Sequence, residues 1–241
     1  MKVCVLLPDY STSAVDYQNY DPPRNLAALL PNDEVDTIFL NKLTTYKQLK
    51  NVSKKGYDIF VNLCEGYLEW EVPSIDVIYT LELLNLPYTG PTTLLYDPLK
   101  ELMKYVAYCE NVQTPAYTLL TANDDVATAI QHLRFPLFVK PAKAGDSLGI
   151  DENSLVNNIN ELQQKINDTI KEYDELLIEE YIEGREFTVL VIANEDLKTS
   201  TALHPVEFIF PAGKKFKTYA LKTSELHTDA NIPVADKNLS N

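Results

Sequence analysis

The first ninety residues alternate between short apolar runs and segments with helical spacing, and this alternation constrains the fold more than any other feature. Compact apolar runs, rich in β-branched or aromatic side chains, predict buried strands at 2–7, 35–40 and 58–63. Helical spacing predicts helices at 22–30, 44–52 and 73–85, the first and last opened by proline. Alternating strands and helices form parallel sheets, so we expect a parallel α/β domain that ends near Gly90.

A second architecture follows from Asp97. Segment 97–112 predicts an amphipathic helix, and the remaining pattern predicts helices at 124–133 and 154–170 and strands at 113–120, 136–142, 175–182, 186–193 and 200–210. We expect the last two strands to be antiparallel, and the polar stretch 227–241 to have no strand to pair with. This part of the chain therefore reads as an α+β block.

Charge and cysteine content limit the possible binding partners and the cellular compartment. The chain carries 21 basic and 35 acidic residues, a formal charge of −14, which repels nucleic acid and anionic membranes alike. ATP is not excluded, because a few local lysines set the potential inside a cleft. Cys4, Cys64 and Cys109 are widely spaced and odd in number, which fits neither a disulfide framework nor a zinc pattern. With no signal sequence or membrane span recognised, we expect a cytoplasmic protein.

Residues 139–150, VKPAKAGDSLGI, carry the most specific chemistry. A buried strand delivers Lys140 and then opens into a loop that holds two of the chain's seven glycines, Gly145 and Gly149. Glycine allows successive N–H groups to face an anion, and a lysine at the strand end adds a charge within reach of the same phosphate. The loop therefore predicts phosphate binding, with a plain surface hairpin as the alternative.

Acidic residues mark the crossing at 176–189, LLIEEYIEGREFTV. Backbone groups at such a crossing can read an adenine edge, and a carboxylate can accept from ribose hydroxyls. Glu186 suits the ribose because it lies inside an apolar strand, where an unpartnered carboxylate is costly. Glu183 is better explained as a solvated turn residue.

Five segments in order resemble the ATP-grasp superfamily, and within it the D-alanine–D-alanine ligase-like branch. They are VNLCEGY, LPYTG, DPLKELMKY with QTPAY, FPLFVKPAKAGDSLGI, and LIEEYIEGREFTVLVI. The resemblance implies a Rossmann-like pre-ATP-grasp α/β domain at 1–92, an ATP-grasp small subdomain at 93–183 and a partial large subdomain at 184–241, incomplete at the C-terminus. It also implies ligation through an acylphosphate that an amine attacks.

The resemblance carries site residues onto matching positions. It implies phosphate contacts from Lys100 and Lys140, with Lys104 as a competitor of Lys100 one helical turn away. The loop 145–149, including Gly145 and Ser147, would cover the phosphates. Glu179, with backbone groups of Tyr181 and Ile182, would face adenine, Glu186 would bind ribose, and Lys222 falls near a further phosphate-contacting lysine.

Catalytic residues are less well defined, with Glu65, Asp146, Ser147 and Lys222 as candidates. Glu65 follows the third predicted strand, where parallel sheets commonly bind ligands, although it could equally cap a turn. Asp146 stands where true D-alanine–D-alanine ligases have a serine, and Thr223 where they have a tyrosine. These departures favour a different small amino-acid or carboxylate substrate.

The family's magnesium ligands have no counterpart after Glu207, so we expect ATP and Mg²⁺ as cofactors with the metal ligands beyond the end of this chain. The main hypothesis is an N-terminal part of a longer ligase, inactive alone, with a homodimer as its candidate assembly. A natural short variant that binds ATP or ADP without catalysis is the alternative. An unrelated α/β binding protein, with Lys140 dispensable for nucleotide, is a third.

Overall fold

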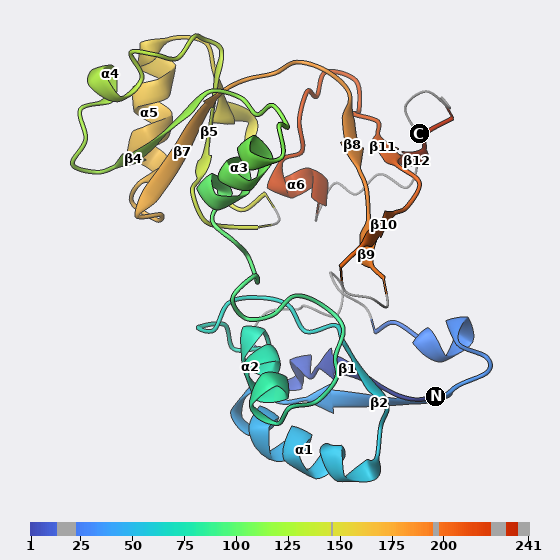
Figure 1. Cartoon of the computed structure of the whole chain (residues 1–241). Coiled ribbons are helices and arrows are strands. Elements are labelled where there is room, and N and C mark those ends of the chain that lie inside the picture. Colours follow the sequence, from blue (N-terminus) through green and yellow to red (C-terminus); the bar gives the residue numbers. More distant parts are fainter. Residues whose placement is uncertain (14–22, 146, 195–197, 223–229, 236–241) are drawn as a thin grey trace. The chain divides into compact units, whose positions relative to one another are not determined.

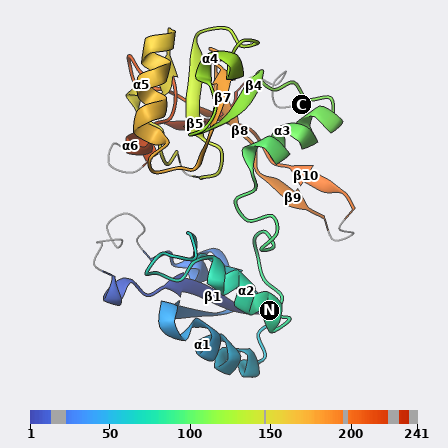
Figure 2. The same ribbon diagram turned by 90° about the vertical axis from the view of Figure 1, so that its left-hand side faces the viewer.

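The computed structural model of this chain describes residues 1–13, 23–145, 147–194, 198–222 and 230–235. The chain folds as two compact units, Met1–Pro98 and Leu99–Asn241 (Figure 1, Figure 2). The expected order, a parallel α/β unit followed by an α+β unit, is confirmed. The finer boundaries at 92 and 183 stay predictions.

The first unit is built on a parallel sheet with strand order β2-β1-β3. Its strands are β1 (Lys2–Pro8), β2 (Glu34–Leu40) and β3 (Ile59–Asn62), and its helices are α1 (Thr45–Val52) and α2 (Ile75–Leu83). Alternate residues of β1 enter two different apolar clusters. Cys4 and Leu6 pack with residues of α1 and α2, whereas Val3 and Val5 pack with another group that includes Leu26. The central strand is therefore buried on both faces, as its apolar run predicts.

Two local predictions in this unit are wrong. The described part of 22–30 holds only a single 3-10 turn, Leu26–Leu29, because Pro31 disfavours a helical Leu30, and residues 23–25 form neither helix nor strand. Strand β2 is largely exposed rather than buried, since it lies at the edge of the sheet and pairs with β1 alone. The short extended piece around Tyr88 is confirmed, because Tyr88 forms a parallel bridge to Phe60.

The second unit opens with helix α3 (Lys100–Cys109) and an antiparallel sheet with strand order β4-β7-β5-β6. The strands are β4 (Tyr117–Thr121), β5 (Leu137–Pro141), β6 (Leu155–Val156) and β7 (Glu175–Glu180), and the helices α4 (Val126–Ala129) and α5 (Ile159–Thr169) follow β4 and β6. Helix α5 begins at Ile159 rather than 154, because Asn158 caps it through the N–H groups of Asn160 and Glu161.

The remaining strands form two small antiparallel sheets. Strands β8 (Glu186–Thr188), β11 (Val206–Phe208) and β12 (Asn231–Pro233) form one, and β9 (Val191–Ala193) pairs with β10 (Ser200–Ala202) in the other. The antiparallel expectation is confirmed, but each predicted strand is divided in two. Pro205 lies at the second break, where a residue without an N–H cannot continue a ladder.

The expectation of no paired strand in 227–241 is also wrong. Strand β12 pairs with β11, which offers it a free edge opposite β8. Its three residues contain one apolar side chain, Ile232, so the sequence carries too little periodicity to indicate a strand. Helix α6 (Tyr219–Lys222) completes the described elements. None of the helices within the described ranges is both long and apolar enough to span a membrane.

Candidate functional site: a pocket on the polar face of the second unit

The pocket is built on strand alternation. In β5 and β7, Leu137, Val139 and Ile178 belong to the apolar cluster under α5. The alternate residues Phe138, Lys140 and Glu179 are displayed on the opposite face, since Phe138 pairs with Glu179 directly across the ladder. One face of this sheet therefore holds the unit together, while the other is left to carry polar groups.

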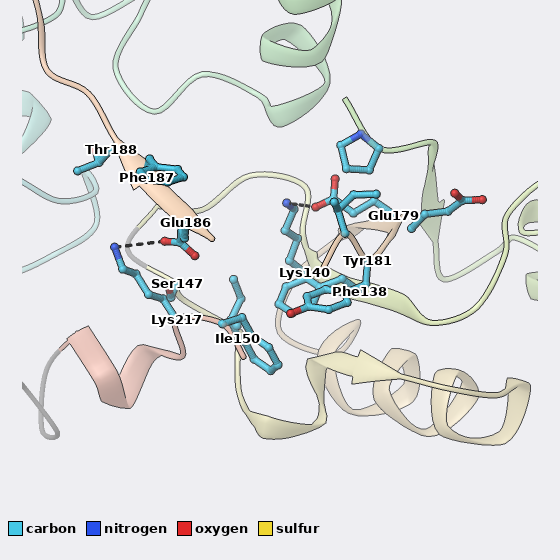
Figure 3. A pocket seen from close by; sticks show the side chains of 14 residues that line it. Phe138, Lys140, Ser147, Ile150, Glu179, Tyr181, Glu186, Phe187, Thr188 and Lys217 are labelled. Carbon is cyan, nitrogen blue, oxygen red and sulfur yellow. Dashed lines mark hydrogen bonds and ion pairs between the residues drawn. The ribbon is translucent and has the colours of Figure 1, made fainter. Parts of the chain in front are cut away.

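A pocket of about 430 Å³ opens on that face (Figure 3). This volume lies within the range of about 300–1,000 Å³ that is usual for small-molecule sites. Its lining combines four aromatic rings with charged side chains of both signs. The residues are Pro115, Phe138, Lys140, Ser147, Ile150, Glu179, Glu180, Tyr181, Ile182, Glu186, Phe187, Thr188, Phe216 and Lys217.

Glu179 is held by two lysines. Lys140 forms an ion pair with its Oε1 from the pocket side, and Lys104 Nζ of α3 lies 2.8 Å from its Oε2. All three side chains are at least four-fifths buried, so the charges are shielded from bulk water. The carboxylate and the two ammonium groups thus form one compact network.

The structure separates the two lysines of α3. Lys100 Nζ donates to the carbonyl of Ala144 at 2.7 Å, at the start of the glycine-containing loop. Lys104 donates to the carbonyl of Pro115 at 3.1 Å and lies 4.8 Å from the ring centroid of Tyr117. Neither lysine lines the pocket, but Lys100 lies at its loop and Lys104 lies behind Glu179.

Glu186 faces Lys217, with 3.2 Å between Oε1 and Nζ (Figure 3). Lys217 also lies 4.0 Å from the ring centroid of Phe208. Lys217 and its neighbour Phe216 line the pocket, and sequence reasoning did not select either residue. The basic run KKFK at 214–217 was the available signal, but an exposed charged turn has the same composition.

Tyr181 and Ile182 lie at the crossing that leaves β7. The Tyr181 ring stacks on Phe138, its hydroxyl donates to the Lys215 carbonyl at 2.9 Å, and its N–H donates to the Pro136 carbonyl at 3.0 Å. Burial, followed by the nearby charge of Glu183, raises the pKa of Tyr181. The Tyr181 N–H is therefore already engaged by the Pro136 carbonyl.

The loop after β5 is only partly described. Ser147 lines the pocket with a left-handed φ of 60°, a conformation that is costly for a residue other than glycine. Gly149 has φ 73°, and a Cβ there would lie 2.6 Å from Pro141 Cγ, so a side chain would not fit. Gly145 precedes the lining residue Ser147, and Asp146 lies outside the described residues.

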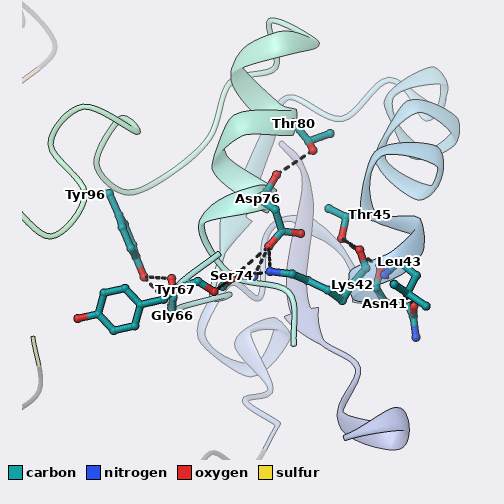
Figure 4. Close-up of polar contacts among 10 residues, drawn as sticks. All are labelled: Asn41, Lys42, Leu43, Thr45, Gly66, Tyr67, Ser74, Asp76, Thr80 and Tyr96. Atoms are coloured by element: carbon teal, nitrogen blue, oxygen red, sulfur yellow. Dashed lines mark hydrogen bonds and ion pairs between the residues drawn. The ribbon is translucent and has the colours of Figure 1, made fainter. Parts of the chain in front are cut away.

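The proposed roles of Lys222 and Glu65 stay predictions. Lys222 ends α6, but its side chain and Thr223 lie outside the described part of the chain. Glu65 is an exposed residue of the first unit, on the loop after β3. Next to it, Gly66 exchanges hydrogen bonds with the Tyr96 hydroxyl (Figure 4).

The first unit contains a polar cluster around Asp76. Lys42 Nζ lies 2.7 Å from Asp76 Oδ1, which also accepts from the Ser74 N–H and hydroxyl (Figure 4). Within the described chain, the buried Oδ2 of Asp76 has no hydrogen-bond partner. This cluster links the segments that precede α1 and α2.

The described residues do not provide a metal centre. Among them, no group of three or more His, Cys, Asp or Glu side chains is placed to hold a metal ion. Glu179 and Glu186 are each neutralised by lysine, which further disfavours a cation beside them.

Comparisons with known proteins agree on one family. Residues 108–239, more than half of the 241, match the family model described as D-ala D-ala ligase C-terminus. The chain is 35% identical to D-alanine–D-alanine ligase A of Bacillus cereus over 133 residues, which cover 54% of this chain and 43% of that protein. It is 30% identical to the D-alanine–D-alanine ligase of Petrotoga mobilis over 210 residues, 83% of this chain and 60% of the relative.

A solved structure extends the likeness to the fold. The D-alanine–D-alanine ligase of Bacillus anthracis complexed with ATP superimposes with a TM-score of 0.63 at 21% identity, covering 98% of this chain and 71% of that one. The chain spans less than two thirds of the length of the curated relatives above.

Proposed function

Since the chain belongs to the D-alanine–D-alanine ligase family, we propose that its second unit binds ATP in the pocket described above, as part of an ATP-dependent carboxylate–amine ligase. One observation carries the proposal. Lys140, Glu179 and Glu186, for which the resemblance implies contacts to phosphate, adenine and ribose, come from three different strands and line the same pocket.

The chemistry of the pocket fits a nucleotide. The rings of Phe138, Tyr181 and Phe216 offer apolar surface to a base, and Lys140 offers positive charge to phosphates. We propose that Glu179 accepts from the adenine amine beside the Ile182 N–H, and that Glu186 accepts from ribose hydroxyls. Lys100, Gly145 and Ser147 would act at the phosphate end. The hydrogen bond from Lys100 Nζ to the Ala144 carbonyl, at the start of this loop, supports that assignment.

Bound ATP supplies a phosphoryl group that can activate a carboxylate as an acylphosphate, which an amine then attacks. The residues of this chain would bind and orient the nucleotide and neutralise its charge, which is most of what such a transfer requires. Mg²⁺ is expected for the family's reaction, but the described residues do not form a site for it, so no step is assigned through the metal.

We propose that the substrate differs from the D-alanine pair. Asp146 and Thr223 stand where the resemblance implies a serine and a tyrosine, and a carboxylate at 146 would repel a substrate carboxylate. A small amino acid or carboxylate remains the expected substrate class. A cytoplasmic location is proposed because ATP is the cosubstrate and all three cysteines are free thiols.

The test is calorimetric titration of the chain with ATP, with and without Mg²⁺, using Lys140→Ala as the probe. Loss of a charge-assisted contact costs about 1.5–3 kcal/mol, so Kd should rise about tenfold to a hundredfold. Lys171→Ala, which removes an exposed lysine at the far end of α5, should bind as the wild type does. Absence of ATP binding by the folded wild-type chain would refute the proposal.

A second assay separates ligase from simple binding module. Phosphate release should be measured with ATP, Mg²⁺ and a panel of small amino acids. Release that depends on an amino acid supports the ligase over the non-catalytic alternative. ATP affinity without release is expected under both hypotheses, because the chain is expected to be inactive alone.

A further inference from the structure

We infer that Lys104 is a positioning residue that holds Glu179 in place for adenine and leaves Lys140 free to move to the phosphates. The inference rests on the proposed function, because it concerns how the same pocket selects its nucleotide. It adds a residue that does not touch the ligand and that lies outside the segments 139–150 and 176–189.

The contacts of Lys104 hold its ammonium group away from the pocket lining. Nζ lies 2.8 Å from Glu179 Oε2, 3.1 Å from the Pro115 carbonyl oxygen and 4.8 Å from the ring centroid of Tyr117. Two of its three donors are therefore engaged by oxygen atoms behind Glu179. The side chain is 10% exposed, which keeps solvent away from these contacts.

Strand register explains why Lys104 meets Glu179 from behind. Tyr117 of β4 pairs directly with Glu179 of β7, and Phe138 of β5 pairs with Glu179 on the other side, so the carboxylate emerges from the middle strand of three. Lys104 approaches over the β4 side, whereas Lys140 approaches from β5, within the pocket lining. Each carboxylate oxygen therefore has its own lysine.

The different roles of Lys104 and Lys140 follow from the charge of Glu179. If Lys140 turns towards a phosphate, Glu179 loses one cation while only 12% of its side chain is exposed. An uncompensated carboxylate there would be costly, and Lys104 removes that cost because it stays on Oε2. The freed Oε1 then faces the pocket as a hydrogen-bond acceptor, which suits an exocyclic amine and repels a carbonyl oxygen.

The sharpest readout is base preference. Inosine triphosphate differs from ATP in having a carbonyl where adenine carries the amine, so the ratio of the two Kd values reports on the Glu179 acceptor. We expect the wild type to bind ATP at least tenfold more tightly than inosine triphosphate. Lys104→Met should raise the Kd for ATP about tenfold and reduce the preference for ATP over inosine triphosphate at least threefold. The reason is that Glu179 then either keeps Lys140 as its partner or loses its orientation.

Two further variants make the test specific. Lys100→Met, one turn earlier on α3, should change both Kd values by the same factor and leave the ratio intact, since its partner is a loop carbonyl. In a Glu179→Gln background, Lys104→Met should change the ratio less than twofold, because the residue through which Lys104 acts is already altered. Circular dichroism checks that each variant is folded, and Lys104→Gln, which keeps a donor, replaces Lys104→Met if the latter does not fold.

The outcomes distinguish the two proposals. If the wild type binds ATP and Lys104→Met keeps the wild-type ratio, the role of Lys104 is refuted and ATP binding stands. If the wild type binds neither nucleotide, the proposed function fails and the inference fails with it.

Discussion

Lys140 and Glu179 lie diagonally across neighbouring strands, two positions apart in the β5–β7 register, and form an ion pair over the pocket. Lys140 pairs with Leu177 in the ladder, and Glu179 pairs with Phe138. Because the pair is diagonal, the two side chains meet while the pocket beside the aromatic residues stays open. The same pair provides a stability test of the network that does not require nucleotide.

Replacing Glu179 should destabilise the chain more than replacing Lys140. Glu179→Gln leaves two lysines facing each other with no anion between them, and we expect a loss of roughly 3–5 kcal/mol in unfolding free energy. Lys140→Met leaves Glu179 paired with Lys104, so the loss should be roughly 1 kcal/mol or less. Urea denaturation followed by circular dichroism measures both. The reverse order would contradict the shared-carboxylate network.

Glu186 should discriminate nucleotides by their sugar. If Glu186 accepts from ribose hydroxyls, Glu186→Ala should raise the Kd for ATP about tenfold, because a charge-assisted hydrogen bond contributes roughly 1.5 kcal/mol. The Kd for 2′,3′-dideoxy-ATP should barely change. Glu183→Ala is the matched control, because Glu183 is exposed, pairs with Lys215 at 3.3 Å and does not line the pocket. Equal weakening of both nucleotides would show that Glu186 acts only through Lys217.

Phe216 should contribute to binding of the nucleotide base and not to binding of the phosphates. Its ring meets Phe138 edge to face at a centroid distance of 4.9 Å and lines the pocket. Loss of an aromatic surface against a base costs about 1–3 kcal/mol, so Phe216→Ala should weaken ATP while tripolyphosphate binding changes less than twofold. Phe210→Ala removes a ring that packs on Phe208 outside the pocket and should leave both affinities unchanged.

Cys4 predicts an alkaline loss of stability in the first unit. Burial, followed by the charge of Asp36, raises the pKa of Cys4 to about 11 from its usual 9.0. A raised pKa in the folded state leaves stability intact below about pH 9 and lowers it as pH rises towards 11, because only the unfolded thiol ionises readily. The loss of unfolding free energy is about 3 kcal/mol at most, because each pKa unit corresponds to about 1.4 kcal/mol.

Urea unfolding at pH 8 and pH 10.5 measures this effect. Cys4→Ala, although less stable overall, should lose less stability between the two pH values than the wild type. Cys109→Ala, at an exposed position, should keep the wild-type loss. An identical pH dependence in the wild type and Cys4→Ala would show that another group, such as the buried Tyr57, is responsible.

Features with a local cause could be read from the sequence. The sequence predicts strands β1, β3, β5 and β7 because a buried strand must be apolar along its length or on alternate residues. This pattern can be recognised within a few neighbouring positions. Lys140 and Glu186 stand out for the same reason. A charged residue that interrupts or directly follows an apolar strand needs a partner, whatever the partner is.

Features that depend on distant partners could not be read in this way. The breaks between β8 and β9 and between β10 and β11, and the pairing of β12, depend on which strand edges are available after folding. Lys100 and Lys104 look equivalent on a helix, yet one reaches the Ala144 carbonyl and the other reaches Glu179. Lys217 joined the site only because its segment lies beside Glu186.

The sequence by itself therefore determined the class of fold, the family and the strands that carry the polar residues, because periodicity and short motifs are local properties of the chain. Tertiary structure alone decided which lysine neutralises which carboxylate and which aromatic rings surround them. Ion-pair partners are chosen by strand register and by the crossing of α3 over the sheet, and neither is encoded in the spacing of nearby residues.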